Sequence, residues 1–253
     1  MFKKLAVLMG AMTLLVGCSS GGGTADSSAT SQTKDVLTMG TNAGFPPFEY
    51  YEGNNIVGFD VDLAGLIAEE LGMELKIEDM EFNSLIGAVN SGMIDIAIAG
   101  ISVTEDKVDQ VEFTQTYFVS NQSIIVPVES DILDADDLIG KTIGVQLSTT
   151  GDILAQDIED AKIVQFSKAA LAVADLKNGT VDAVIIDNEP AKQFVSGQLD
   201  IMVLPTAFVE EDYAMAIKKG NIELLDAVNG ALDTIIETGK YDELYNKYFD
   251  FEE

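Results

Sequence analysis

The chain has 253 residues, of which 43 are acidic and 14 are basic, giving a formal net charge of −29. This negative charge excludes nucleic acid as a partner, because phosphates would be repelled rather than neutralised. Histidine is absent, which excludes Ser-His-Asp and Cys-His catalysis and histidine-ligated metal sites. The composition therefore favours a binding protein over an enzyme, with no catalytic residue, metal or cofactor expected.

The first 17 residues have the layout of a secretory signal peptide. Lys3 and Lys4 give a positive start, and residues 5–16 form an apolar run that is shorter than the about 20 residues a membrane-spanning helix needs. Residues 15–18 (LVGC) resemble the lipobox of bacterial lipoproteins, in which the cysteine is acylated and becomes the first residue. We therefore expect an extracytoplasmic protein held to the cell membrane, periplasmic or at the cell surface, by a lipid on Cys18.

Residues 18–35 are expected to be the lipidated N-terminus and a flexible spacer. Small and polar residues dominate this segment, so no large apolar side chain offsets the entropy of ordering it. A coil of this composition spans roughly 20–25 Å. Cys18 is the only cysteine, so the body has no internal disulfide and depends on its hydrophobic core.

From residue 36 the chain alternates short apolar, β-branched runs with helical patterns, which predicts an α/β fold built on mainly parallel sheets. Helices that end at a glycine are typical of such a body. The predicted strands cover residues 36–40, 73–77, 94–99, 142–146, 163–166 and 181–186, and the predicted helices cover residues 60–71, 84–91, 222–238 and 241–249.

Residues 90–100 and 177–187 resemble each other: each has a helix end, a glycine, and a strand with an early aspartate. Two similarly built lobes would produce this repeat, but any helix–glycine–strand corner looks alike, so the repeat alone leaves both explanations open. Ligands of two-lobed α/β proteins bind at the carboxyl ends of strands. This rule places Gly100 and Ser102 on one side of a cleft and Asp187 on the other.

Several motifs in order resemble the amino-acid-binding proteins of ABC importers, known as bacterial extracellular solute-binding proteins, family 3. The resemblance implies a two-lobed, type II periplasmic-binding-protein-like fold. Lobe 1 would comprise residues 36–120 and 208–253, lobe 2 residues 121–207, and two crossings near 121–126 and 204–212 would form the hinge. The motifs lie at residues 41–49 (TNAGFPPFE), 57–64 (VGFDVDLA), 104–117, 144–151 (GVQLSTTG), 182–187 (DAVIID) and 239–245 (GKYDELY).

The resemblance also implies a set of ligand contacts for a buried amino-acid zwitterion, whose charges need partners. Asp187 would accept from the ammonium group together with the Gly100 carbonyl and the Ser102 hydroxyl. Lys107 and main-chain N–H groups near Ser102 and Thr150, each where a loop enters a helix, would hold the carboxylate. The remaining expected contacts are the rings of Phe45 and Phe82 beside the ligand side chain, and Asn42, Gln146 and Thr149.

Each of these residues also has a structural alternative. Asp187 fits the N-cap of a following helix, and Lys107 fits an ordinary solvated lysine. Phe45, Phe48 and Phe82 all fit the core. Phe48 is interpreted as core, whereas Phe45 and Phe82 match family positions whose rings flank the ligand side chain. Asp60 and Asp62 are interpreted as first-turn helix acids rather than a metal pair, because calcium-loop spacing is missing.

Three positions depart from the family pattern. Lys107 stands where the family usually has arginine, and lysine cannot make a bidentate fork to a carboxylate. Ser148 replaces a glycine, which matters if that glycine has positive φ. Asn42 stands where several binders of cationic side chains have aspartate, so a neutral polar side chain fits as well as a basic one.

We therefore expect a monomeric receptor that captures a polar or basic L-amino acid and delivers it to the membrane permease of an ABC importer. One alternative is an enzyme resembling the cyclohexadienyl or arogenate dehydratases on this fold, with Glu189 as the candidate general acid. Another is a sensor that presents its ligand state to a partner receptor. Fold alone does not separate these functions.

Overall fold

The computed structural model describes residues 35–205 and 209–249. The predicted signal peptide, Cys18 and all but the last residue of the predicted spacer lie outside the described residues. Within the described part of the chain, no helix has both the length and the apolar character needed to cross a membrane.

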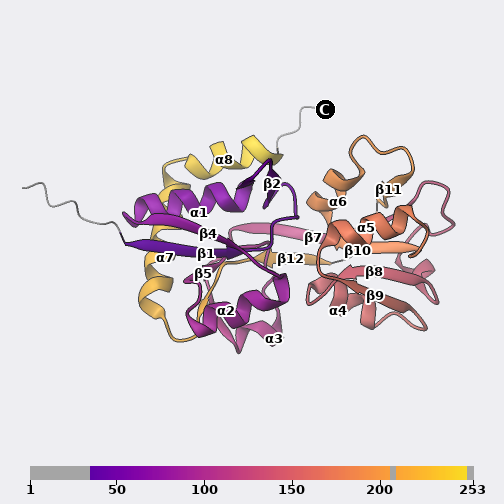
Figure 1. Ribbon diagram of the computed structural model, residues 1–253, viewed down its shortest axis with the longest axis horizontal. Coiled ribbons are helices and arrows are strands. Elements are labelled where there is room, and N and C mark those ends of the chain that lie inside the picture. Colours follow the sequence, from indigo (N-terminus) through magenta and orange to yellow (C-terminus); the bar gives the residue numbers. More distant parts are fainter. Residues whose placement is uncertain (1–34, 206–208, 250–253) are drawn as a thin grey trace, which may run out of the picture. The chain divides into compact units, whose positions relative to one another are not determined.

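The fold contains two main sheets (Figure 1), and their strands follow the same order. Apart from one strand that we call the crossing strand (β13 in the first sheet, β7 in the second), the strands of each sheet are counted along the chain. Across the sheet the second strand comes first, followed by the first, the third, the crossing strand and the fourth. β1 is parallel to its neighbours β4 and β5, and β8 is parallel to β9 and β10. The crossing strands β13 and β7 are antiparallel to both of their neighbours. The first sheet is β4 (Glu74–Asp79), β1 (Val36–Thr41), β5 (Ile96–Ala97), β13 (Ala216–Lys218) and β6 (Val111–Phe113); the second is β9 (Lys162–Phe166), β8 (Thr142–Gln146), β10 (Ala183–Asp187), β7 (Phe118–Pro127) and β11 (Ile201–Val203).

Strands β7 and β12 (Glu210–Tyr213) connect the two sheets and pair with each other in an antiparallel ladder. In Figure 1 both lie between the group of elements around β1 and the group around β8. β2 (Tyr50–Glu52) and β3 (Asn55–Val57) form a separate hairpin.

The helices flank the two sheets, and the predicted ones appear within one or two residues of their expected bounds. The predicted strand 94–99 is paired only at Ile96–Ala97, although Ile94, Ile98 and Ala99 are also buried. The apolar run at residues 94–99 therefore indicates which residues are buried, not how many of them pair with a neighbouring strand. The helices are α1 (Phe59–Glu70), α2 (Leu85–Ser91), α3 (Glu105–Val108), α4 (Thr150–Gln156), α5 (Ala169–Lys177), α6 (Asn188–Val195), α7 (Ile222–Glu237) and α8 (Lys240–Phe249), with 3₁₀ turns at Phe82–Ser84 and Ala135–Leu138.

The two similar sequence segments fold into matching corners. Gly92 after α2 and Gly179 after α5 have positive φ values of 75° and 72°, a conformation that glycine adopts without strain. The Asp95 carboxylate accepts from the Thr38 N–H at 2.8 Å, and the Asp182 carboxylate accepts from the Thr142 N–H at 2.8 Å. Each aspartate thus fixes the first strand of its own sheet.

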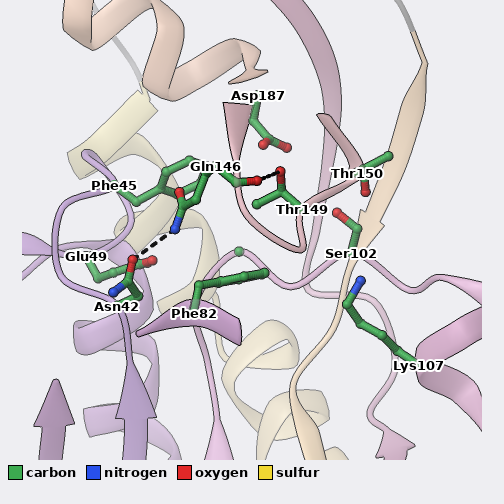
Figure 2. Close-up of a pocket in the computed structure, with 12 residues that line it drawn as sticks. Asn42, Phe45, Glu49, Phe82, Ser102, Lys107, Gln146, Thr149, Thr150 and Asp187 are labelled. Atoms are coloured by element: carbon green, nitrogen blue, oxygen red, sulfur yellow. Dashed lines mark hydrogen bonds between the residues drawn. The ribbon is translucent and has the colours of Figure 1, made fainter. Parts of the chain in front are cut away.

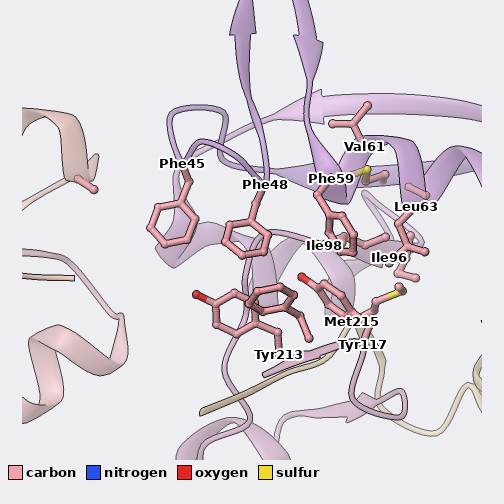
Figure 3. Close-up of a cluster of buried hydrophobic side chains, with 14 of the residues drawn as sticks. Phe45, Phe48, Phe59, Val61, Leu63, Ile96, Ile98, Tyr117, Tyr213 and Met215 are labelled. Carbon is pink, nitrogen blue, oxygen red and sulfur yellow. The ribbon is translucent and has the colours of Figure 1, made fainter. Parts of the chain in front are cut away.

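Aromatic side chains dominate the core beside the crossing strands (Figure 3). Phe48 is fully buried, which confirms its interpretation as core. Its ring centroid lies 5.0 Å from that of Phe118 and 5.3 Å from that of Tyr213, in edge-on arrangements that aromatic pairs favour. The Phe59 and Tyr117 rings continue the cluster at 6.3 Å. This packing fixes the tyrosines that reach the site described next.

Candidate ligand-binding site

One pocket gathers all ten residues that the sequence predicts as ligand contacts (Figure 2). It lies where β1, β5, β8 and β10 end, as the strand-end rule predicts. In Figure 2, Asn42 and Glu49 lie on one side, and Ser102, Lys107 and Thr150 on the other. The lining residues are Asn42, Phe45, Glu49, Phe82, Ala99, Gly100, Ser102, Lys107, Gln146, Thr149, Thr150 and Asp187.

Asp187 occupies the N-cap position of α6, yet its side chain makes no capping hydrogen bond. Its carboxylate instead accepts from the Tyr213 hydroxyl at 2.5 Å and from the Ser120 hydroxyl at 3.4 Å. The side chain is 6% exposed, and this burial, with the charge of Glu211, raises the pKa of Asp187 to about 7. A cation beside Asp187 would relieve this unfavourable burial of charge.

Lys107 is 6% exposed, so the solvated-lysine alternative is wrong. Its Nζ donates to the Thr104 hydroxyl at 2.9 Å, and no acidic oxygen of the described residues lies within ion-pair distance. Burial lowers the pKa of Lys107. A buried ammonium without a counter-ion favours an anionic group in the pocket.

Ser102 donates a hydrogen bond to Glu211 on β12, an acid that sequence reasoning missed. Glu211 is buried, and its Oε1 has no hydrogen-bond partner among the described residues. The expectation that Ser102 lies at a helix start is wrong, because α3 begins only at Glu105 with Thr104 as N-cap. Ser102 instead forms an isolated antiparallel β-bridge with Tyr213, the last residue of β12.

The loop before α4 contains the other two hydroxyl residues of the pocket. Thr149 caps α4 by accepting from the Asp152 N–H at 3.3 Å, and it donates to the Gln146 carbonyl at 2.8 Å. Thr150 is the first residue of α4, as expected, and its Oγ1 is buried with no partner among the described residues. Ser148 has a φ of 67°, so the position where the family has glycine is left-handed in this chain.

Asn42 and Gln146 join the ends of β1 and β8. The Gln146 amide donates to the Asn42 oxygen at 3.0 Å, and the Asn42 amide donates to the Met80 carbonyl at 2.6 Å. Close by, Lys168 Nζ donates to the Ala43 carbonyl at 2.7 Å and lies 3.7 Å from the Asp79 carboxylate. These contacts hold elements of the two sheets together along one side of the pocket.

Glu49 lines the pocket and was not predicted as a site residue, although it ends the motif at residues 41–49. Its side chain is 1% exposed, and it neighbours Asp60, whose N–H donates to the carbonyl of the preceding residue, Phe48, at 2.9 Å. Burial and the charge of Asp60 raise the pKa of Glu49 well above its usual value. A single acid after an apolar Phe-Pro-Pro-Phe run is the local signal that could have identified it.

Asp60 is the second residue of α1, so its placement in the first turn is confirmed. It does more than complement the helix dipole, because it is fully buried and its Oδ2 accepts from the Gly100 N–H and the Tyr117 hydroxyl, both at 2.9 Å. Asp62 is different: it lies near the surface and bonds Lys247 and Tyr248 at 2.6 and 2.7 Å. Asp60 therefore fixes the pocket backbone at Gly100.

The family described as bacterial extracellular solute-binding proteins, family 3, matches residues 37–251. The arginine-binding extracellular protein ArtP of Bacillus subtilis (strain 168) is 34% identical over 256 residues, covering 98% of this chain and 98% of that protein. The chain belongs to this family. Its relatives of known structure include an ancestral arginine-binding protein solved with arginine, at a TM-score of 0.82 and 39% identity over 86% of this chain and 99% of that one.

An ancestral arginine-binding protein has also been solved bound to glutamine, at a TM-score of 0.80 and 38% identity over 85% of this solute-binding protein and 98% of that chain. These neighbours confirm the predicted two-lobed type II fold. A further neighbour is AncCDT-1, an ancestral amino-acid-binding protein and precursor of cyclohexadienyl dehydratase, at a TM-score of 0.80 and 32% identity over 85% of this chain and 95% of that one. The relatives named here are thus binding proteins, one of them a precursor of an enzyme.

Glu189, the acid considered for dehydratase chemistry, is not among the residues that line the pocket. Its carboxylate accepts from Lys192 Nζ at 2.7 Å and from the Asn188 amide at 3.0 Å. Both partners belong to α6 itself, so this carboxylate is held by its own helix rather than by the pocket.

Proposed function

We propose that this solute-binding protein captures an L-amino acid with a basic or neutral polar side chain, arginine foremost, and delivers it to the permease of an ABC importer. The observation that carries the proposal is that the two sides of the pocket favour ligand groups of opposite charge. One side holds Lys107 and the Thr150 hydroxyl, which has no partner within residues 35–205 and 209–249, and the other holds the buried acid Glu49. Arginine-binding relatives support the same ligand class.

The ammonium and carboxylate groups of the ligand would each meet a buried side chain of opposite charge. Asp187 accepts hydrogen bonds and lacks a cation among the described residues, so it would bind the ammonium, with the Gly100 carbonyl beside it. Lys107 and Thr150 would bind the carboxylate. Buried charges left unpaired cost several kcal/mol, so both ends favour a zwitterion over an amine or an acid alone.

The ligand side chain would run between Phe45 and Phe82 toward Asn42 and Glu49. Aromatic faces suit the flat guanidinium group through cation–π contact. Glu49 supplies the acid for a cationic side chain, which offsets the replacement of the family's frequent aspartate by Asn42.

Ligand entry would require the two lobes to separate. The cavity is only about 10 Å³, which is room for about one water molecule. We assign lobe 1 to residues 36–120 and 208–253 and lobe 2 to residues 121–207, with β7 and β12 in the hinge crossings. Contacts across the pocket, such as Gln146 to Asn42 and Lys168 to Ala43, would break on opening and be re-formed around the ligand, which thereby favours closure.

The lipid expected on Cys18 would hold this monomeric receptor at the membrane beside its permease. Cys18→Ala should release or misprocess the protein in cells, while the purified body keeps its ligand affinity. Fractionation of cells and calorimetry on the body test the two parts separately.

Calorimetry with a panel of the twenty amino acids tests the binding proposal directly. We expect dissociation constants well below millimolar for arginine and weaker binding for acidic amino acids. Failure of every free amino acid to bind below about millimolar would overturn the proposed function. Turnover of prephenate or arogenate by the purified protein would instead support the dehydratase alternative.

A further inference from the structure

Two buried acids, Glu49 and Asp60, are neighbours at the side-chain end of the pocket, where the Asp60 N–H donates to the carbonyl of Phe48, the residue before Glu49, at 2.9 Å. Glu49 is 1% exposed and Asp60 is fully buried. Asp60 Oδ2 already accepts from the Gly100 N–H and the Tyr117 hydroxyl. The other oxygen, Oδ1, and Glu49 Oε2 are buried and have no further donor among the described residues.

Two neighbouring buried carboxyl groups disfavour two negative charges, so the pair favours keeping one proton. The two donors on Asp60 stabilise its ionised form, so the proton belongs mainly to Glu49. The direction of the titration agrees, because burial and the neighbouring Asp60 raise the pKa of Glu49 well above its usual value. Among the described residues no lysine forms an ion pair with either group.

We propose that Glu49 and Asp60 share one proton, which a cationic ligand side chain displaces and a neutral amide side chain retains. The proposal rests on the function proposed above and concerns the side-chain end of the same pocket. With a guanidinium group bound, the O–H bond of Glu49 breaks, its proton passes to solvent, and the carboxylate pairs with the cation. With an amide side chain bound, the proton stays between Glu49 and Asp60, and the Glu49 carboxyl accepts from the amide NH₂ group.

The arrangement makes the choice of ligand depend on pH. At high pH the pair loses its proton readily, and arginine gains affinity. At low pH the pair holds its proton, and glutamine competes better. Ancestral arginine-binding proteins have been solved with arginine and with glutamine, which is consistent with pockets of this kind that accept either side chain.

Other titratable groups face the Glu49–Asp60 pair and influence its protonation. Asp187 and Asp79 act on Glu49, with Lys168 paired to Asp79, while Tyr117 and Tyr241 face Asp60. Asp187 is the main competitor, because it also changes protonation when an ammonium binds. Every amino acid brings that ammonium, so the difference between arginine and glutamine isolates the Glu49–Asp60 pair.

Calorimetry of the wild-type protein in buffers with different ionisation enthalpies measures the protons released on binding. Near pH 7 we expect arginine to release about one proton more than glutamine. The ratio of arginine to glutamine affinity then rises toward about tenfold per pH unit. Equal proton release for both ligands from pH 5 to 8 would overturn the proposal while leaving amino-acid binding intact. If neither ligand binds, the proposed function and this inference fail together.

Variants assign the proton to the pair. Glu49→Gln should abolish the difference in proton release and lower arginine affinity by at least about 30-fold, with glutamine affinity changed by less than about threefold. Glu52→Gln, on the exposed hairpin, is the matched control and should behave as wild type. Infrared difference spectra of the wild type should show loss of a protonated carboxyl band on adding arginine. Persistence of that band would also contradict the proposal.

Discussion

The two corners that end at the pocket, residues 90–100 and 177–187, share one backbone arrangement but present different chemical groups to the pocket. Each has a left-handed glycine, an aspartate that fixes the first strand of its sheet, and a central strand. They differ at the last residue, which is Gly100 in one and Asp187 in the other. Strand ends of the same construction thus present a bare backbone on one side and a carboxylate on the other.

The difference extends to the tyrosines behind each corner. Tyr213 donates to Asp187, whose carboxylate lines the pocket. Tyr117 donates to Asp60, which lies behind Gly100 and binds its N–H. Each corner therefore has a tyrosine–aspartate pair, but only one of the two aspartates, Asp187, lines the pocket. The comparison shows that the scaffold is fixed by strand order, whereas the charge is set by single residues.

The largest expected effect comes from removing the charge that distinguishes the corners. Asp187→Asn should weaken binding of every amino acid by about 2–5 kcal/mol, or about 30- to 5,000-fold, because a buried ammonium loses its counter-ion. Calorimetry measures this loss, and Asp182→Ala, an exposed acid of the same corner, is the control. Binding within threefold of wild type would show that Asp187 does not receive the ammonium.

The pH dependence of stability should sharpen the contrast between the two buried aspartates. Burial raises the pKa of Asp60 to about 6 and that of Asp187 to about 7, whereas both titrate near pH 4 in the unfolded chain. Between about pH 4 and 7 the folded state therefore binds more protons, so the stability of the ligand-free protein falls as pH rises. Each group contributes a slope of up to about 1.4 kcal/mol per pH unit.

Thermal unfolding of the ligand-free protein at a series of pH values measures this slope. Asp187→Asn should remove the Asp187 contribution to the slope from about pH 4 to 7, and the Asp60 contribution, which ends near pH 6, should remain. A ligand-free protein that becomes more stable from pH 5 to 8 would contradict both assignments.

Replacing Gly100, the corner residue that presents only backbone, should lower both the stability of the fold and the ligand affinity. In Gly100→Ala a Cβ would lie 3.0 Å from the Phe45 ring and 3.1 Å from the Tyr213 ring, at a φ of +54°. The left-handed conformation alone costs about 1–2 kcal/mol for a non-glycine residue. Urea unfolding measures the loss. Gly230→Ala within α7, where no atom crowds a new Cβ, should instead stabilise by about 0.5–1 kcal/mol.

The shared part of the corners should respond equally to matched substitutions. Asp95→Ala and Asp182→Ala each remove a carboxylate acceptor from a strand N–H, at a cost of about 1 kcal/mol, which lowers Tm by about 2–4 °C. Ligand affinity should stay unchanged in both. A large loss in one variant alone would show that the corners are not equivalent.

The smallest expected effect concerns Ser148, a non-glycine residue with a positive φ close to the Thr150 hydroxyl. Ser148 has a φ of 67° two residues before Thr150, as Gly100 has a positive φ two residues before Ser102. Ser148→Gly should raise stability by up to about 1 kcal/mol, because glycine adopts this conformation without strain. Ser148→Ala keeps the strain and should give no gain in chemical denaturation.

Local patterns made the helices and their glycine ends predictable. Apolar spacing and a left-handed glycine depend only on neighbouring residues, as Gly92 after α2 illustrates. Strand β13 was not predicted, because its three residues form a strand only by pairing with β5 and β6, which lie far upstream. Strand β7 was missed for a related reason: Ser120, Asn121 and Gln122 interrupt its apolar run.

The pocket residues were found through motifs of the family rather than through composition. The same reasoning missed Glu49 and Glu211, because an acid in a chain of strongly negative charge usually faces solvent. Their burial depends on what packs around them after folding, with Asp60 beside Glu49 and Ser102 beside Glu211. No local pattern contains that information.

The position of β13 also determines when each sheet can assemble as the chain emerges from a ribosome or a translocation pore. Strands β7 to β11 form a continuous segment, so the second sheet can assemble once residue 203 has emerged. The first sheet must wait, because β13 lies between β5 and β6 and is formed by residues 216–218. Until then β5 has an open edge, so the middle of the chain is able to fold before the beginning.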